Sequence, residues 1–476
     1  MNQIKTLING QFINTKNSLE VYNPANNELL ALVPNIDDEA QINDIFKQAH
    51  NAYLKYKDSS IEDRVALLEK FASLIESNKE ELATIIMNEV AKGYKDSLVE
   101  VERSVEYMRA TNVEYLKLIK NPTVFDQSIH GVKNKVATYY RLPVGVVLAI
   151  SPFNYPINLL ISKLAPALVA GNSVVYKPST QGAMIGIKLA ELAHQAGYAP
   201  GVINCLTTDA RKYGDLLVTN QYVKALSFTG GPKVGNRMAQ ITSKISLVLE
   251  LGGKDPALVL DDADLELAAN EIVKGAFSYS GQRCTAIKRV FVSSKNHDQL
   301  LSLINQKVNQ LTVGLPKDNP TIVPLINNNT VKYNIDLLED AKNKGAVWCQ
   351  ELKVDHSHNL LYPMVVDQVN EQMRIAWEEP FGPILPIIVY DHLDQALELI
   401  NRSEYGLQAS VFTSNLDNIE QLALQIESGT ININRSSSRG PDILPFFGVK
   451  DSGFGIQGIV DAILSMTTIK GVVINK

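Results

Sequence analysis

Residues 173–207, SVVYKPSTQGAMIGIKLAELAHQAGYAPGVINCLT, predict a strand, a helix and a second strand in that order. The β-branched run SVVYKP is typical of a strand, and the apolar residues of GIKLAELAHQAG recur at helical spacing up to Gly197. VINCLT is again a short β-branched run. A strand, a helix and a strand within this length form a β-α-β unit, which predicts a parallel sheet covered by helices.

The same alternation continues on both sides of this unit. Residues 37–118 predict mostly helices, because RVALLEKFASLIESNKEELATIIMNEV places apolar residues three and four positions apart. Strands and helices then alternate through VKALSFTG and GNRMAQIT, and again through IKRVFVSS, HDQLLSLINQKVNQL and LPIIVYDHLDQALELIN. We therefore expect two α/β units in one chain. The C-terminal IKGVVIN predicts a strand without an evident local partner, which would pair elsewhere in the chain or with another subunit.

The composition excludes several classes of protein. With 476 residues, 45% hydrophobic and 20% charged, the chain can bury a large core. Its net charge is −6 and it has no basic tract, which argues against a nucleic-acid partner. No apolar stretch approaches the roughly 20 residues of a membrane span, and no secretory signal is evident. Three widely separated cysteines predict neither a disulfide framework nor a metal site, so we expect a soluble cytoplasmic protein with reduced thiols.

One cysteine lies in an unusual setting. Cys284 in SYSGQRCTAIKR is surrounded by small, polar and basic residues rather than apolar ones. A thiolate is the reactive form of cysteine, and a neighbouring cation such as Arg283 would lower the thiol pKa. The alternative is a buried, inert thiol, which fits Cys205 and Cys349 better. The sequence therefore favours Cys284 as a nucleophile.

The partner of this thiol is expected to be a carboxylate. None of the seven histidines lies in a glycine- or proline-marked motif, and the pair His356 and His358 lacks further ligands, so we expect no metal. In LELGGKDP, Glu250 is a single carboxylate between leucines. Such surroundings predict a raised pKa, which suits a general base. The alternative is a structural ion pair at the end of a strand.

Two further motifs predict an anion site and an oxyanion site. FTGGPKVG, with Gly230, Gly231 and Gly235, has a strand before it and a helix after it, so the helix N-terminus would bind a pyrophosphate, or the glycines would only make a tight turn. In SPFNYP, Asn154 lies between two prolines, which would hold its amide rigidly for an oxyanion hole, or form a plain turn. GFGIQG, residues 453–458, matches a dinucleotide fingerprint but lacks the required context, so we interpret it as a loop.

These motifs occur together in one known family. FNYP, YKPST, FTGGPKVG, LELGGKDP, GQRCT, EEPFGP and LPFFGVKDSG follow one another in an order that resembles the aldehyde dehydrogenase superfamily over essentially the whole chain. The resemblance implies an α/β fold with a Rossmann-like cofactor domain, an α/β catalytic domain and a small β oligomerisation arm, assembled as a homotetramer. The expected divisions are 1–118 and 135–250 for the cofactor domain, 251–434 for the catalytic domain, and 119–134 and 435–476 for the arm and C-terminal segment.

The resemblance also implies roles for the residues selected above. Cys284 would attack an aldehyde to form a thiohemiacetal, with the Asn154 amide and the Cys284 backbone N–H holding the oxyanion. Hydride transfer would leave a thioester, which water activated by Glu250 would hydrolyse. The cofactor would contact Pro152, Lys177, Ser179, Thr180, Gly230, Gly231, Gly235, Leu251, Glu379 and Phe381. Family members that prefer NAD often carry a glutamate where this chain has Thr180, so NADP is expected to be preferred over NAD.

The arginines indicate the substrate. Arg103, Arg283 and Arg439 match the branch of non-phosphorylating glyceraldehyde-3-phosphate dehydrogenases, in which such residues gather around the substrate phosphate. Tyr155 and Thr285 are expected to lie with them. The alternatives are succinate semialdehyde or another anionic aldehyde, an inactive nucleotide-binding relative, and arginines that are only surface charges. The run NRSSSRGPD adds Arg435, so the sequence leaves open whether Arg435 or Arg439 faces the phosphate.

Overall fold

The computed structural model describes residues 4–475. Two short hairpins at the N-terminus are followed by the helical region that the sequence predicts, and side chains of Asp38 and Ser60 cap the first two long helices. No helix among residues 4–475 is long and apolar enough to cross a membrane. These elements are β1 (Thr6–Ile8), β2 (Gln11–Ile13), β3 (Ser18–Tyr22), β4 (Leu29–Pro34), α1 (Glu39–Tyr56), α2 (Ile61–Ser77), α3 (Lys79–Val90) and α4 (Tyr94–Lys120).

The first of two large sheets has six strands in the order β23-β11-β10-β7-β8-β9, all parallel except β23. Its β8-α6-β9 segment is the β-α-β unit predicted from residues 173–207. The chain order reverses at β7, and ligands bind at the carboxyl ends of strands beside such a reversal. The elements are β7 (Val146–Ile150), α5 (Asn158–Ala170), β8 (Ser173–Lys177), α6 (Ala183–Ala196), β9 (Ile203–Cys205), α7 (Ala210–Val218), β10 (Val223–Thr229), α8 (Pro232–Ile241), β11 (Ser246–Glu250), β23 (Gly453–Phe454) and α14 (Ile459–Ser465).

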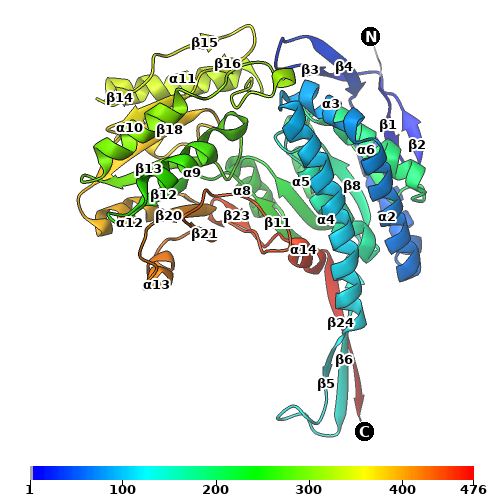
Figure 1. Cartoon of the computed structure of the whole chain (residues 1–476). Coiled ribbons are helices and arrows are strands. Elements are labelled where there is room, and N and C mark those ends of the chain that lie inside the picture. The colour runs from blue at the N-terminus through cyan, green and yellow to red at the C-terminus, as the bar shows by residue number, and fades with distance from the viewer. Residues whose placement is uncertain (1–3, 476) are drawn as a thin grey trace.

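The second large sheet has seven strands in the order β14-β17-β18-β13-β12-β20-β21, parallel except for β14. Figure 1 shows it with its helices as a separate lobe beside the first sheet. The pairs β15–β16 and β19–β22 form two further two-stranded sheets. The elements between residues 255 and 450 are β12 (Asp255–Val259), α9 (Leu265–Phe277), η1 (Ser278–Gly281), β13 (Ile287–Ser293), α10 (His297–Val308), η2 (Pro316–Asp318), α11 (Asn328–Asn343), β14 (Val347–Trp348), β15 (Val354–Asp355), β16 (Leu360–Leu361), β17 (Met364–Asp367), η3 (Arg374–Ala376), β18 (Ile384–Tyr390), α12 (Leu393–Asn401), β19 (Tyr405–Gly406), β20 (Gln408–Phe412), α13 (Ile419–Ala423), β21 (Thr430–Ile433) and β22 (Val449–Lys450).

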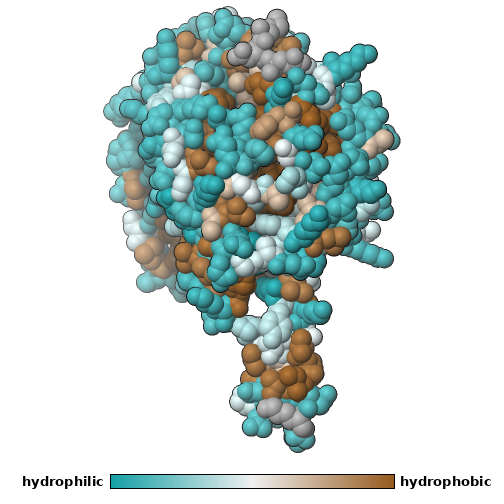
Figure 2. Space-filling view, turned by 90° about the vertical axis from the view of Figure 1, so that its right-hand side faces the viewer, coloured by the Kyte–Doolittle hydropathy of each residue, from teal (hydrophilic) through white to brown (hydrophobic). Residues whose placement is uncertain are grey.

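A three-stranded antiparallel arm extends away from both lobes (Figure 1). The C-terminal strand β24 (Thr467–Asn475) pairs along its length with β6 (Lys135–Pro143), which also pairs with β5 (Thr123–Phe125). Apolar side chains gather on the arm (Figure 2), and they include Val124, Tyr140, Ile469, Val472, Val473 and Ile474, which are 45–59% exposed.

The boundaries between the arm and the two lobes differ from those that the sequence predicts. Residues 135–143, expected in the cofactor domain, form the central strand of the arm. Within the expected C-terminal segment, β23 joins the first sheet, and only β24 reaches the arm. Strand pairing between segments more than 200 residues apart leaves no local signal in the sequence, which is why these divisions differ.

Candidate active site

A cavity of about 190 Å³ contains Cys284 and draws residues from both lobes. The short segment 251–254 joins the end of β11 to the start of β12, so the last residue of one sheet comes close to the first residue of the other. Seven residues predicted from the sequence line this cavity: Arg103, Tyr155, Glu250, Arg283, Cys284, Thr285 and Arg439. Residues Asn158, Leu159, Thr229, Ser438 and Phe446 complete it.

Cys284 is partly exposed and has a less reactive thiol than the sequence predicts. Burial raises the pKa of the Cys284 thiol to about 11, and the nearby Lys288 lowers it only in part. The expectation that Arg283 would lower this pKa is wrong, because the Arg283 guanidinium donates to the carbonyl of Gly275 instead. The side chains of Arg283 and Cys284 point in different directions although the two residues are adjacent. Lys288, four residues further along the chain, donates from its Nζ to the Cys284 carbonyl at 2.6 Å.

Glu250 is a buried carboxylate held by cations. Lys163 Nζ lies 3.1 Å from its Oε2, Arg439 Nη1 lies 2.5 Å from its Oε1, and Thr229 Oγ1 donates to Oε2 at 2.5 Å. Burial would raise the pKa of Glu250, but Arg439 and then Lys163 outweigh it and lower the pKa to about 2. The predicted raised pKa is therefore wrong, because the two cations outweigh the burial that its leucine neighbours suggest.

The amide of Asn154 is fixed in place beside the nucleophile's segment. Asn154 is 4% exposed, and its Nδ2 donates to the carbonyl of Gln282 at 2.9 Å, two residues before Cys284. Its Oδ1 accepts from the backbone N–H of Tyr155 at 3.1 Å. An amide nitrogen carries two N–H donors, so one remains beyond the bond to Gln282.

The predicted arginines meet in the cavity, but two of them already have carboxylate partners. Arg103 forms a bidentate pair with Asp442, at 2.7 Å through both nitrogens. Arg439 pairs with Glu250 and lies 3.7 Å from Asp442. Three arginines and one glutamate line the cavity, so its lining carries a net positive charge. Arg435 is exposed and is not part of the lining, so Arg439 is the arginine that faces the cavity.

The predicted phosphate-binding turn has the geometry that an anion requires. β10 ends at Thr229 and α8 begins at Pro232. The exposed residue Gly231 is the N-cap of α8, and it makes no side-chain capping hydrogen bond to the first turn of the helix. A Cβ on Gly231 would meet no atom within 4 Å, so the helix N-terminus is open to a ligand. Gly235 has another reason to be glycine, because a Cβ there would lie 2.3 Å from Leu251 Cδ2. These residues fit the pyrophosphate of a dinucleotide.

The other predicted cofactor residues lie at the ends of β8 and β7 and in the loop before β18. Lys177 is 6% exposed, donates to the Pro178 carbonyl at 3.0 Å, and has a pKa lowered to about 8 by burial. Glu379 pairs with Lys288 at 3.0 Å and accepts from the Gly253 N–H at 3.2 Å. The rings of Phe381 and Phe153 meet edge to face at 5.9 Å. The remaining residues of this group, Pro152, Ser179 and Thr180, are partly exposed.

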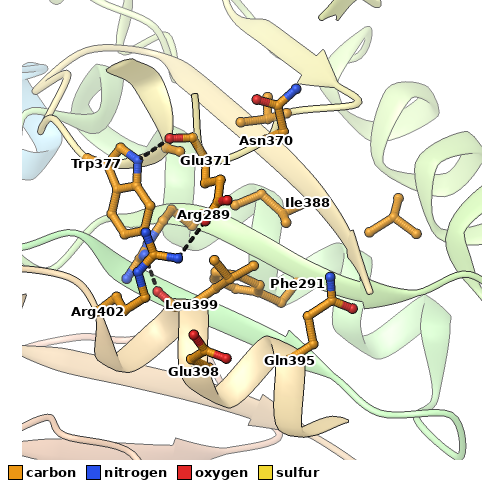
Figure 3. Close-up of a pocket in the computed structure, with 13 residues that line it drawn as sticks. Arg289, Phe291, Asn370, Glu371, Trp377, Ile388, Gln395, Glu398, Leu399 and Arg402 are labelled. Atoms are coloured by element: carbon orange, nitrogen blue, oxygen red, sulfur yellow. Dashed lines mark hydrogen bonds and ion pairs between the residues drawn. The ribbon is translucent and has the colours of Figure 1, made fainter. Parts of the chain in front are cut away.

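A second cavity, of about 440 Å³, lies beside α12 and holds none of the predicted site residues. Figure 3 shows its wall, where the Trp377 indole N–H donates to the Glu371 carbonyl and Arg402 pairs with the Glu371 carboxylate. Arg289 lines it as a buried side chain that donates to the Lys254 carbonyl. The cysteine, the paired carboxylate and the arginines of the first cavity make that smaller one the candidate active site.

The sequence reasoning missed Lys163, Thr229, Lys288 and Asn158. Lys163 had a usable signal, because it is the only charged residue of the helix NLLISKLAPALVA. Thr229 directly precedes the Gly230–Gly231 turn. Lys288 lies four residues after the nucleophile, and nothing in its surroundings distinguishes it from a surface lysine.

The sequence pattern of the aldehyde dehydrogenase family matches residues 12–472, and this chain belongs to that family. It is 42% identical over 471 residues to the NADP-dependent glyceraldehyde-3-phosphate dehydrogenase of Streptococcus equinus, covering 99% of this chain and 98% of the relative. It is 42% identical over 439 residues to the protein of the same name from Apium graveolens, covering 92% and 88%. The crystal structure of NADP-dependent glyceraldehyde-3-phosphate dehydrogenase from Bacillus halodurans C-125, complexed with NADP, matches with a TM-score of 0.97 and 44% identity over both whole chains. The predicted family and fold class are confirmed.

Proposed function

We propose that this protein oxidises D-glyceraldehyde 3-phosphate irreversibly to 3-phosphoglycerate with NADP. The observation that carries this proposal is the cavity in which Cys284 and Glu250 lie among Arg103, Arg283 and Arg439. Arginine forks suit phosphate oxygens, and the net positive lining suits an anionic aldehyde. Relatives at 42% identity over nearly the whole chain carry the name of this activity.

Cys284 is the nucleophile of the first step. The Cys284 thiol loses its proton to solvent, and the thiolate sulfur then bonds to the aldehyde carbon. The electron pair of the carbonyl π bond moves to the oxygen, which becomes an oxyanion. The free N–H of Asn154 and the backbone N–H of Cys284 hold that oxygen, because preorganised donors stabilise charge that develops in the transition state. NADP, when bound, would supply the hydride acceptor for this carbon, and the substrate would then remain attached to Cys284 as a thioester.

Glu250 is the base of the second step. It takes a proton from water, whose oxygen bonds to the thioester carbon and expels the Cys284 sulfur. A carboxylate with a pKa of about 2 is a weak base. The substrate phosphate competes with Glu250 for Arg439, and loss of that partner makes Glu250 more basic when substrate is bound.

The residues that would hold the cofactor lie at the carboxyl ends of the first sheet and in the loop before β18. Gly230, Gly231 and the N-terminus of α8 would hold its pyrophosphate, and Gly235 packs against Leu251 beneath this turn. Lys177, Ser179 and Thr180 would hold the adenosine ribose and its 2′-phosphate, since no carboxylate occupies position 180. Pro152, Glu379 and Phe381 would position the nicotinamide end.

The proposal also assigns the domains of the chain and its oligomeric state. The first sheet with the N-terminal helices is the cofactor domain, the second sheet is the catalytic domain, and the arm joins subunits in a homotetramer. The exposed apolar side chains of β5, β6 and β24 support this, because apolar surface of this extent is covered by a partner in stable proteins. Three unpaired cysteines support a cytoplasmic location.

The test follows NADPH absorbance with glyceraldehyde 3-phosphate in a buffer free of inorganic phosphate. Steady turnover is expected, because water rather than phosphate cleaves the thioester, and Cys284→Ala is expected to abolish it. Turnover with succinate semialdehyde alone would keep the Cys284 chemistry and contradict the proposed substrate. Binding of NADP without oxidation of any aldehyde would contradict the enzymatic function.

A further inference from the structure

Asn158 is a polar side chain of the active-site cavity that the proposed mechanism does not use. Asn158 is the first residue of α5 and lines the cavity with Cys284, Arg103 and Tyr155. It is 2% exposed, and among residues 4–475 its Nδ2 has no hydrogen-bond partner. Buried amide groups almost always have partners, so an unpaired one that faces a cavity indicates a ligand atom.

The backbone position of Asn158 is fixed by contacts with helix α4. Its backbone N–H donates to Glu100 Oε1 at 3.1 Å, and Glu100 forms an ion pair with Lys92 in which both side chains are 1% exposed. Lys92 Nζ lies 3.6 Å from the centre of the Tyr155 ring, a cation–π contact. Helices α4 and α5 pack together, so Glu100 holds the start of α5 against α4. Asn158 and Tyr155 therefore share one rigid support, which fixes the backbone from which the Asn158 amide extends.

The chemistry of the proposed substrate leaves one polar group for this amide. Its aldehyde carbon must lie at the Cys284 sulfur, and its phosphate suits the charged arginines. The hydroxyl on C2, next to the aldehyde carbon, is the remaining polar group. An uncharged amide matches an uncharged hydroxyl, which can accept from Nδ2 and donate to Oδ1.

Resting on the proposed function, we propose that Asn158 hydrogen-bonds the C2 hydroxyl and makes the enzyme selective for 2-hydroxy aldehydes. A site with a buried polar group discriminates strongly against a substrate that leaves the group unpaired. The wild type is therefore expected to prefer glyceraldehyde 3-phosphate over 3-oxopropyl phosphate, which lacks only this hydroxyl, by about 100-fold in kcat/KM.

The experiment measures kcat/KM for both substrates in the wild type and in Asn158→Leu, which keeps the size of the side chain and removes its amide. We expect the variant to lose about 100-fold with glyceraldehyde 3-phosphate and less than threefold with the deoxy substrate, so that the preference disappears. Asn158→Ser, a smaller change that keeps a hydrogen-bonding group, is expected to restore part of the preference. Asn112→Leu is the matched control, because Asn112 is also a buried asparagine with an unpaired amide oxygen, but lies outside the cavity.

Each outcome is decisive. Equal losses with both substrates in Asn158→Leu would show a merely structural role and overturn the proposal, as would a preference that survives in the variant. Equal kcat/KM for the two substrates in the wild type would overturn it while leaving the proposed function intact. Wild-type turnover of neither phosphorylated aldehyde would contradict the proposed function itself.

Discussion

The charge of Arg439 sets the basicity of Glu250, and Arg439→Met tests this. Arg439 Nη1 lies 2.5 Å from Glu250 Oε1, and the pKa of Glu250 is lowered to about 2. Two charges centred about 4 Å apart attract by about 4 kcal/mol at an effective dielectric constant of about 20. Since about 1.4 kcal/mol corresponds to one pKa unit, the variant is expected to raise the pKa of Glu250 by about 3, to about 5.

The assay is hydrolysis of the Cys284 thioester in a single turnover, followed by rapid quench between pH 4 and 9. D-Glyceraldehyde without phosphate is the substrate, so that a lost phosphate contact does not affect the result. Only the carboxylate form of Glu250 accepts a proton, so a higher pKa removes activity at acid pH. The variant is expected to hydrolyse the thioester about tenfold more slowly at pH 4 than at pH 7. The wild type is expected to change less than twofold over the same range.

Arg435→Met is the control for this measurement. Arg435 lies on the same segment but is exposed and does not line the cavity, so its pH profile is expected to match the wild type. Superimposable profiles for the wild type and Arg439→Met would refute the electrostatic account of Glu250. An acid limb near pH 5 already present in the wild type would refute it as well.

Three further predictions follow from the site and the arm. Lys288→Met is expected to slow alkylation of Cys284 by iodoacetamide about tenfold at pH 8, because Lys288 lowers the pKa of the Cys284 thiol. Mass spectrometry follows the alkylation, with the Cys349 peptide as the internal control. An unchanged rate would contradict the role of Lys288. Thr180→Glu is expected to lower kcat/KM for NADP about 100-fold and for NAD less than threefold, because a carboxylate repels the 2′-phosphate; a parallel loss with both cofactors would place the 2′-phosphate elsewhere. Deletion of residues 467–476 removes β24 and is expected to yield monomers in light scattering, whereas an unchanged mass would exclude the arm from the interface.

The sequence by itself determined the β-α-β architecture and indicated the candidate reacting groups. Helical and strand periodicity are local properties, so β8, α6 and β9 follow directly from residues 173–207. The motifs around Asn154, Glu250 and Cys284 are equally local, because each residue lies in a distinctive short segment. These motifs were sufficient to indicate the family, which the comparison over residues 12–472 confirms.

Only the tertiary structure decided the electrostatics of these groups and the pairing of distant strands. The partners of Glu250 are 87 and 189 residues away in the chain, and they reverse the pKa direction that its leucine neighbours predict. The side chain of Arg283 turns away from Cys284 although the two are adjacent, and β24 pairs with β6, which lies more than 300 residues earlier in the chain. A pKa depends on burial and on charges within a few ångströms, and strand pairing depends on which edges meet in space. Neither is encoded by spacing along the sequence.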